Sequence, residues 1–266
     1  ETTRSACIAT SPSKRTLAAS LKKMRNLFLI SFIFFSLKIH SQHGADKEFL
    51  EIRNIVATEN NLKNIEQKLK QYKSTFKDQF KSSVNVFLQR DIDFGYIHTR
   101  IQASLEMNNY QIDFITKNDS IYLKSIKNEY YKNCCSYQWL NEDQLNFYVL
   151  KRNKFYASNK KLETIISEIS SNLEYAMYCG EVYSLTPQGA QVSKFVLKKD
   201  FKGLTEMLSS FSCEMQAFGV AGFSLLSKEK IAIPDQCSKL VTYLKNRNSE
   251  LQICSGCISG LVEKVY

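Results

Sequence analysis

The sequence has very little histidine, which disfavours the catalytic and metal sites that depend on this side chain. Only three histidines occur among the 266 residues. Of these, His98 lies in the strand-like segment "GYIHTR" and is interpreted as a sheet residue rather than as a general base or a metal ligand. A zinc site with mixed cysteine and histidine ligands is therefore not expected.

The motifs of several well-known enzyme classes are missing as well. The chain has no glycine-rich phosphate loop, no G-x-S-x-G nucleophile elbow and no H-E-x-x-H metal motif. Acidic residues are numerous, with 26 Asp and Glu, but no spacing singles out a pair for glycoside hydrolysis. We therefore expect a protein that is not an enzyme and that needs no cofactor and no metal.

No apolar run is long enough to cross a membrane as a helix. The longest one follows a basic start and extends from Leu27 to Leu37, whereas a span requires roughly 20 apolar residues. A polar stretch with the small residue Ser41 comes next, and no cysteine follows to carry a lipid. These features predict a signal peptide over residues 24–42. The protein is then secreted or periplasmic, crosses the membrane during export and keeps no stable anchor.

Residues 1–23 precede this signal and fit it poorly. They contain no methionine and only one acidic residue, and they are interpreted as a leader translated in error, with Met24 as the true start. An organelle transit peptide is the alternative, because the stretch is basic, rich in hydroxyl groups and poor in acids. The signal-like core that follows directly favours the first interpretation.

The excess of positive charge belongs largely to the targeting segment. The whole chain carries a formal net charge of +10. Residues 1–42 hold seven of the 36 basic and one of the 26 acidic side chains, which leaves 29 basic and 25 acidic residues and a net charge of +4. Since the remainder shows no dense basic stripe with interleaved aromatics, nucleic acid is not expected as a partner.

Residues 43–157 are expected to form a domain in which a helical region packs on an antiparallel sheet. From residue 49 to 80 apolar side chains recur every three or four positions, and "ENN" at 59–61 divides this region into two helices. Lysines on this region could bind a membrane surface, but the solvated face of a packed helix is favoured. From residue 84 to about 152 the period is two, as in "YQIDFIT" and "QLNFYVL", which predicts a meander of four or five strands.

The alternation also assigns residues to the two faces of this sheet. Tyr110 and Phe114 fall on one face, and Gln111 and Asp113 fall on the other. The N-terminal helical region is expected to cover the apolar face.

Residues 158–266 are expected to form a helical, repeat-containing domain. "NKKLETIISEISSNLEYAMYCG" reads as one long helix that ends at Gly180. Further on, "LTEMLSSFSCEMQAFGVAGFSLLSK" (204–228) aligns without gaps on "LVTYLKNRNSELQICSGCISGLVEK" (240–264), with six identities in 25 positions. Each copy predicts a helix, a short turn and a second helix, with Asp200 and Asp235 as N-caps of the first helices.

These predicted hairpins resemble HEAT-type helical repeats, in which an "LxxLL" helix is followed by an "E-hydrophobic-x-x-A" helix. The second copy keeps the outline but has Cys254 and Cys257 where the first has Phe218 and Ala221. The resemblance covers roughly a quarter of the chain, and the offset of 36 residues is short for a family whose repeats span about 40 or more. It implies an interaction surface for a protein partner rather than catalysis.

Cysteine is the one reactive side chain that the sequence offers in number. Beyond residue 42 the cysteines are Cys134, Cys135, Cys179, Cys213, Cys237, Cys254 and Cys257. In an oxidising compartment most should pair, and the odd number leaves at least one free or in an intermolecular bond. Because Cys134 and Cys135 are adjacent, each is expected to pair with a distant partner. A four-cysteine zinc site is disfavoured, since only one C-x-x-C pair is present.

Cys254 and Cys257 form that C-x-x-C pair. Ser249 and Gln252 make a capping-box pattern that predicts a helix from about Glu250. Both cysteines then lie deeper than the first turn, where thiol–disulfide enzymes carry their reactive pair. No strand and turn of thioredoxin type precedes them. A structural disulfide is therefore favoured, and thiol–disulfide exchange through this pair is the alternative.

Together, these patterns predict an exported α+β protein, with a helix packed on an antiparallel meander and then a helical region with HEAT-like hairpins. The expected function is non-enzymatic binding or scaffolding for a protein partner, and thiol–disulfide exchange is the main alternative. A third possibility is a small-ligand carrier that uses the aromatic residues of the sheet region, namely Tyr110, Phe114, Tyr122 and Tyr148.

Overall fold

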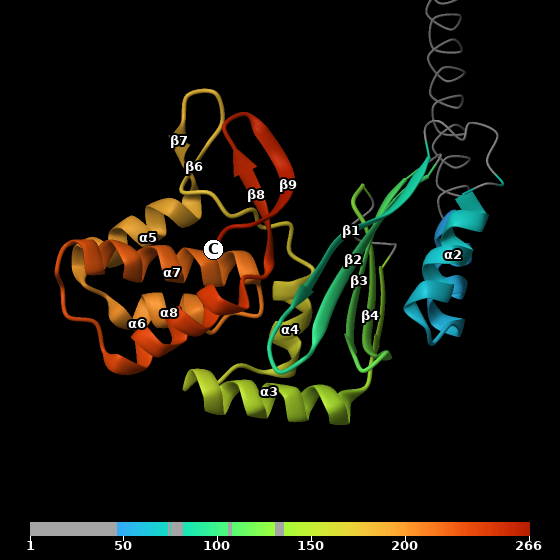
Figure 1. Ribbon diagram of the computed structural model, residues 1–266. Helices are drawn as coiled ribbons and strands as arrows, with labels where there is room; N and C mark the ends of the chain where they lie inside the picture. The colour runs from blue at the N-terminus through green and yellow to red at the C-terminus, as the bar shows by residue number, and fades with distance from the viewer. Residues whose placement is uncertain (1–46, 74, 76–81, 106–107, 131–135) are drawn as a thin grey trace, which may run out of the picture. The chain divides into compact units, whose positions relative to one another are not determined.

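The computed structural model describes residues 47–73, 75, 82–105, 108–130 and 136–266 (Figure 1). The signal-like segment, residues 1–23 and the cysteines at 134 and 135 lie outside the described residues. Glu1–Phe49 form one unit, of which only the last three residues are described and are helical, and Leu50–Tyr266 form a second, compact unit. The second unit combines helices with an antiparallel sheet, so the predicted α+β class is confirmed.

Two helices precede the sheet, as the apolar spacing predicts. The first covers residues 47–58 and the second, α2, covers Leu62–Lys73. Between them, the Asn61 side chain accepts hydrogen bonds from the backbone N–H groups of Lys63 and Asn64, at 2.9 and 3.3 Å. This is an N-cap, and it explains why the helical region divides at 59–61.

The sheet is a five-stranded meander whose neighbouring strands are all antiparallel. Its strands are β1 (Ser83–Asp91), β2 (Ile97–Ser104), β3 (Asn109–Lys117), β4 (Ser120–Asn128) and β5 (Ser136–Leu140). In the turn between β3 and β4, Asn118 and Asp119 have φ angles of 48° and 61°. Such a pair of positive φ angles is what a type I′ hairpin turn requires, and Asn and Asp tolerate them well.

Both faces of the sheet are buried around β3. Phe114 lies opposite Lys124, whose ammonium group donates to the backbone carbonyls of Ala57 and Glu59 at 3.3 and 2.6 Å. This face is therefore turned towards the N-terminal helices, as predicted. Gln111 and Asp113 point to the other face and are each only 1% exposed, because later elements of the chain cover them.

One of these covering elements is α3 (Glu142–Tyr156), where the alternation of "QLNFYVL" wrongly predicts a strand. Asn141 caps the helix by accepting from the Gln144 N–H, and two acidic residues follow in the first turn, next to the positive end of the helix dipole. The buried residues are spaced by three, four and seven positions: Leu145, Tyr148, Val149, Arg152 and Tyr156. The helical period thus prevails over the shorter alternation.

The next helix, α4 (Leu162–Ile169), is much shorter than the helix predicted to end at Gly180. Backbone carbonyl groups at and just after its C-terminal end accept hydrogen bonds from a side chain of the sheet: Arg100 donates to Ile169 O at 2.6 Å and to Ser171 O at 3.1 Å. Beyond it the chain is extended, and Tyr175 bridges to Ile253. The segment then forms a short hairpin of β6 (Tyr178–Cys179) and β7 (Ser184–Leu185).

Four helices follow: α5 (Pro187–Lys198), α6 (Phe201–Leu208), α7 (Cys213–Lys228) and α8 (Asp235–Arg247). α6 and α7 form the predicted helical hairpin, so close that a Cβ at Gly219 would lie 2.9 Å from the backbone nitrogen of Leu208. Asp200 caps α6 as predicted, with its side chain 2.9 Å from the Gly203 N–H. For α8 the cap position is Pro234, so Asp235 is the first helical residue rather than the cap.

The second predicted hairpin is helical only in its first half. Instead of a helix from Glu250, the chain forms β8 (Glu250–Ser255) and β9 (Ile258–Lys264), an antiparallel pair. Gly256 and Gly260 have φ angles of 59° and 77°, which glycine adopts without strain. Gly256 supplies the tight turn between the strands, so the capping-box interpretation of Ser249 is wrong and the HEAT-like outline ends with α8.

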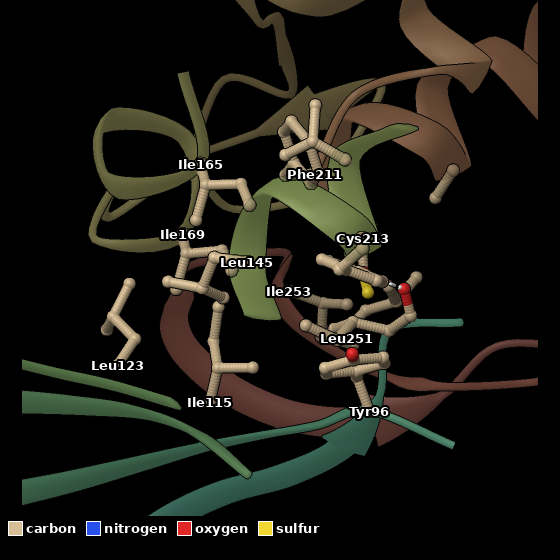
Figure 2. Close-up of a cluster of buried hydrophobic side chains, with 14 residues drawn as sticks. Tyr96, Ile115, Leu123, Leu145, Ile165, Ile169, Phe211, Cys213, Leu251 and Ile253 are labelled. Carbon is tan, nitrogen blue, oxygen red and sulfur yellow. Dashed lines mark hydrogen bonds between the residues drawn. The ribbon is translucent and has the colours of Figure 1, made fainter. Parts of the chain in front are cut away.

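Buried apolar side chains form two clusters. The first joins the sheet to α3, α4, the start of α7 and β8 (Figure 2). Its members include Tyr96, Ile115, Leu123, Leu145, Ile165, Ile169, Phe211, Cys213, Leu251 and Ile253. The second lies among α5, α6, α7 and α8 and includes Val192, Leu204, Leu208, Phe218, Phe223, Leu240 and Leu244. β8 therefore belongs to the core of the sheet region although it lies close to the C-terminal end of the chain.

Candidate functional site

The polar face of the sheet carries charged side chains that pair with residues of the helical part. Arg90 on β1 makes an ion pair with Glu214 on the first turn of α7, and its second terminal nitrogen lies 3.2 Å from the other carboxylate oxygen. Glu214 also accepts from the backbone N–H of Gln252 at 3.0 Å. Burial alone would raise the pKa of the Glu214 carboxyl, but Arg90 and these hydrogen bonds hold it below its usual value.

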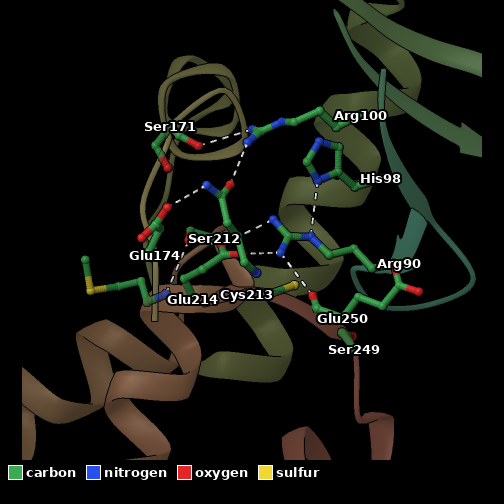
Figure 3. Close-up of polar contacts among 12 residues, drawn as sticks. Arg90, His98, Arg100, Ser171, Glu174, Ser212, Cys213, Glu214, Ser249 and Glu250 are labelled. Carbon is green, nitrogen blue, oxygen red and sulfur yellow. Dashed lines mark hydrogen bonds and ion pairs between the residues drawn. The ribbon is translucent and has the colours of Figure 1, made fainter. Parts of the chain in front are cut away.

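His98 lies beside this pair, and its contacts define its protonation. Its Nδ1 is 3.3 Å from the Nε–H of Arg90 (Figure 3). Since an arginine can only donate, Nδ1 must be unprotonated. The proton is then on Nε2, which donates to Asp113 at 2.9 Å. Burial lowers the pKa of His98 to about 4, helped by Arg90 and Arg100 and opposed by Asp113, so the ring is neutral at pH 7.

Asp113 shares its carboxylate between His98 and Arg100, whose Nε lies 2.8 Å from the same oxygen. A terminal nitrogen of Arg100 donates to the carbonyl of Ile169 at the C-terminal end of α4, where the helix dipole favours positive charge. Burial would raise the pKa of Asp113, but Arg100 and His98 hold it well below its usual value. This chain of contacts links β2 and β3 to the residues that end α4. Figure 3 shows its contact between Arg100 and Ser171.

Asp93, in the turn between β1 and β2, is a second centre of charge. Arg152 of α3 donates to it at 2.6 Å, and Arg247 of α8 forms an ion pair with its other oxygen. Tyr156 and Tyr243 donate their hydroxyls to it at 3.0 and 3.2 Å. Burial and the Asp93 charge raise the pKa of both tyrosines, which therefore stay protonated.

These groups form a buried ionic network rather than an open active site. Arg90, His98, Arg100, Asp113 and Glu214 are each at most 4% exposed, and Asp93 is fully buried. Each of these carboxylates faces at least one arginine. The sequence predicted His98 as a sheet residue, and it is one, but the alternation did not reveal the network. The sequence signal that could have indicated the network was the presence of charged residues on consecutive strands.

The network makes stability dependent on pH through His98. The unfolded residue takes up a proton near pH 6.5, whereas the folded residue does so near 4. The contribution of neutral His98 to the free energy of unfolding is therefore complete above pH 6.5. It is lost as the pH falls towards 4, because the unfolded chain binds the proton first. We expect the free energy of unfolding to fall by about 2 kcal/mol between pH 7 and 5 from this residue.

Urea unfolding at the two pH values measures the loss. His98→Gln is the reference variant, since glutamine can donate and accept hydrogen bonds but does not titrate in this range. The decrease between pH 7 and 5 should be about 2 kcal/mol smaller in this variant. An equal decrease in both proteins would assign the pH dependence to other groups.

The cysteines have a different arrangement from the one predicted. Cys254 forms a disulfide with Cys179, 75 residues earlier, and not with Cys257, which is free and exposed. Cys213, the first residue of α7, and Cys237 on α8 are free and buried. The disulfide ties the β6–β7 hairpin to the β8–β9 hairpin, which also share a hydrogen bond from Gly180 N to Gly256 O at 2.8 Å.

The two tied hairpins expose a group of large apolar side chains, here called the hairpin surface. Its members are Tyr178, Val182, Tyr183, Leu185 and Ile258. Val182 is 85% exposed, Tyr183 66% and Ile258 59%. The rings of Tyr178 and Tyr183 stack at 5.0 Å, which fixes their orientation. The sequence interpretation missed this surface because it placed residues up to Gly180 in a helix. The β-forming residues on both sides of Gly180 were the available signal.

A groove of about 420 Å³ opens among α4, α5, α6 and the start of α7. Glu168 lies in it and accepts from Ser210 Oγ at 2.7 Å and from Lys160 Nζ at 2.9 Å. Of the aromatic residues considered for a ligand carrier, Tyr110 and Phe114 are buried and Tyr148 lies on α3, not on a strand. They are not among the residues that line this groove.

Metal binding and membrane crossing can be addressed for the described part of the chain. Within it, no group of three His, Cys, Asp or Glu side chains is placed to hold a metal ion. No helix there has the length and apolar character that crossing a bilayer demands.

Comparison with known proteins gives no relative: no protein-family model, no curated protein and no solved structure matches the chain.

Proposed function

We propose that the protein is an exported, non-enzymatic binding protein that holds an extended segment of a partner protein at the hairpin surface. The observation that carries this proposal is the exposure of five large apolar side chains on the two tied hairpins, one of which also has an open strand edge. Contiguous exposed apolar groups are unusual in soluble proteins and mark interaction sites. Tyrosine, which supplies two of the five, is enriched at protein interfaces.

The open edge belongs to β9, which starts at Ile258 of the hairpin surface. Among the described residues β9 pairs with β8 alone. All seven of its residues, Ile258–Lys264, are exposed or half-buried, and none is proline. Such an edge offers unpaired N–H and C=O groups to an incoming strand, while neighbouring apolar side chains select its sequence. An extended segment with apolar side chains on one face fits this combination.

The disulfide between Cys179 and Cys254 supports both parts of the proposal. It holds the two hairpins in one arrangement, so less conformational entropy is lost when a partner binds. Disulfides also persist mainly in oxidising compartments, which agrees with the export expected from the signal-like segment at 24–42.

Peptide binding tests the proposal directly. Peptides of about 12 residues, selected from a random display library against the immobilised protein, are expected to be rich in β-branched and aromatic residues. Their affinity, measured by fluorescence anisotropy, should fall at least about tenfold in Val182→Asp/Tyr183→Asp, because two exposed anchors are replaced by charges.

Leu197→Asp is the matched control. Leu197 is 84% exposed on α5 and is not part of the hairpin surface, so its replacement should leave the affinity unchanged. Peptides that bind the double variant as tightly as the wild type would contradict the proposal, and so would a selection that enriches no peptide.

A further inference from the structure

Three cysteines belong to the two hairpins that the disulfide joins. Cys179 and Cys254 share the disulfide, and Cys257 is free and exposed. Ser255 pairs with Ile258, so Gly256 and Cys257 are the two residues of the turn between β8 and β9. A disulfide cysteine near the end of β8 and a free thiol in the turn that follows are the components of thiol–disulfide exchange.

The sulfur of Cys254 already lies over this turn. Its Sγ atom is 3.5 Å from the carbonyl oxygen of Gly256, the residue whose peptide bond leads to Cys257. Cys254 is largely buried, whereas Cys257 is open to solvent. Because Gly256 has a φ of 59°, the turn can readjust without the steric cost that a side chain would add.

We propose that Cys257 is the nucleophile of a thiol–disulfide exchange that moves the bond of Cys254 from Cys179 to Cys257. The Cys257 thiolate attacks Sγ of Cys254, and a bond between these two sulfurs forms. The bond between Cys179 and Cys254 breaks, and its electron pair leaves on Sγ of Cys179. The proton that Cys257 lost ends on Cys179. One disulfide and one thiol are present before and after, so no oxidant or reductant is consumed.

The exchange changes which parts of the chain the disulfide connects. In the first form the disulfide closes a loop between residues 75 positions apart. In the second it closes a loop of three positions within one turn, and the β6–β7 hairpin is free of its covalent link. The hydrogen bond from Gly180 N to Gly256 O still joins it to the β8–β9 hairpin, and the bridge between Tyr175 and Ile253 still holds the segment that precedes it. The inference rests on the cysteines and holds whatever the hairpin surface binds.

Peptide mapping distinguishes the two forms. Trypsin places Cys179 in the peptide 162–194 and both other cysteines in the peptide 248–264. The purified protein is incubated at pH 8 without reductant, its thiols are blocked with N-ethylmaleimide, and the digest is analysed by mass spectrometry without reduction. In the first form the two peptides are linked and Cys257 is blocked. In the second, peptide 248–264 carries an internal disulfide and Cys179 is blocked.

We expect the exchanged form to appear at pH 8 as on the order of a tenth or more of the protein. It should form more slowly at pH 6, because the thiolate is the attacking species, and at a rate that does not change on dilution. Cys257→Ser should abolish it, and because the residue is exposed, the serine should not disturb folding.

Cys213→Ser is the matched control, since it removes a buried thiol outside the cluster and should leave the exchange intact. If the wild type shows only the linked peptides after incubation, the proposal is overturned. It is equally overturned if Cys179 becomes blocked in Cys257→Ser, because another thiol would then be the nucleophile.

Discussion

Replacement of Asp93 by asparagine is expected to lower the free energy of unfolding by about 3–5 kcal/mol, because two arginines lose their counter-charge at once. Arg152 and Arg247 both pair with this carboxylate, and Tyr156 donates to it from within the core. Asparagine keeps the size of the side chain and tolerates the positive φ of 107° at this position. The loss of charge should therefore dominate the effect.

Asp119→Asn is the matched control, because Asp119 also lies in a β-turn at positive φ but is exposed. Its effect should stay within about 0.5 kcal/mol. Urea unfolding of the three proteins at pH 7, followed by circular dichroism, measures both changes. If Asp93→Asn were as stable as the wild type, the turn would not depend on its charge for joining the sheet to α3 and α8.

Glu214→Gln is expected to lower the free energy of unfolding by a similar amount, about 3 kcal/mol, because it too leaves a buried arginine without its counter-charge. Glutamine can still accept from Gln252 N, but Arg90 is left buried without a negative partner. For a unit of this size, each kcal/mol shifts the melting temperature by about 2–4 °C. A fall of roughly 10 °C in a thermal scan is therefore the expected result.

Glu229→Gln is the control for this variant, since Glu229 lies exposed at the other end of α7. A double variant, Arg90→Met/Glu214→Leu, should recover part of the loss because it leaves no unpaired charge. Recovery in the double variant would assign the loss to the uncompensated arginine. No recovery would assign it to the packing of the glutamate itself.

The meander could be predicted because its information is local. Alternation within β3 and the turn residues Asn118 and Asp119 specify strands and connections between neighbours in sequence. The class of the fold follows from these patterns and from the helical spacing on both sides.

The segments that were predicted wrongly depend on distant contacts. Tyr148 and Arg152 of α3 bond to Ile92 O and Asp93, 56 and 59 residues earlier, which a short alternating window does not contain. For β8, the decisive contacts are Glu214 and Tyr175. Local propensity was ambiguous in both places, and tertiary contacts decided the outcome.

The candidate site was predictable in its elements and not in its pairing. The sequence shows the cysteines and an odd number of them, but spacing does not state connectivity. Cys179 meets Cys254 because the extended chain after α4 runs beside β8. The hairpin surface was not predicted either, because it forms where Tyr178 pairs with Leu185 and folds this extended segment into a hairpin.

The position of β8 also determines when the molecule can fold. Leu251 and Ile253 complete the core of the sheet region, and Glu250 supplies the carbonyl that Arg90 binds at 3.1 Å. While the ribosome is still making α8, the sheet lacks these groups, and Arg90 lacks one of its acceptors, which lies 160 positions further along the chain. A unit built on such long-range contacts folds slowly. The chain should therefore remain open until β8 has been synthesised, which is the state in which a membrane channel can take up a protein for the export that we propose.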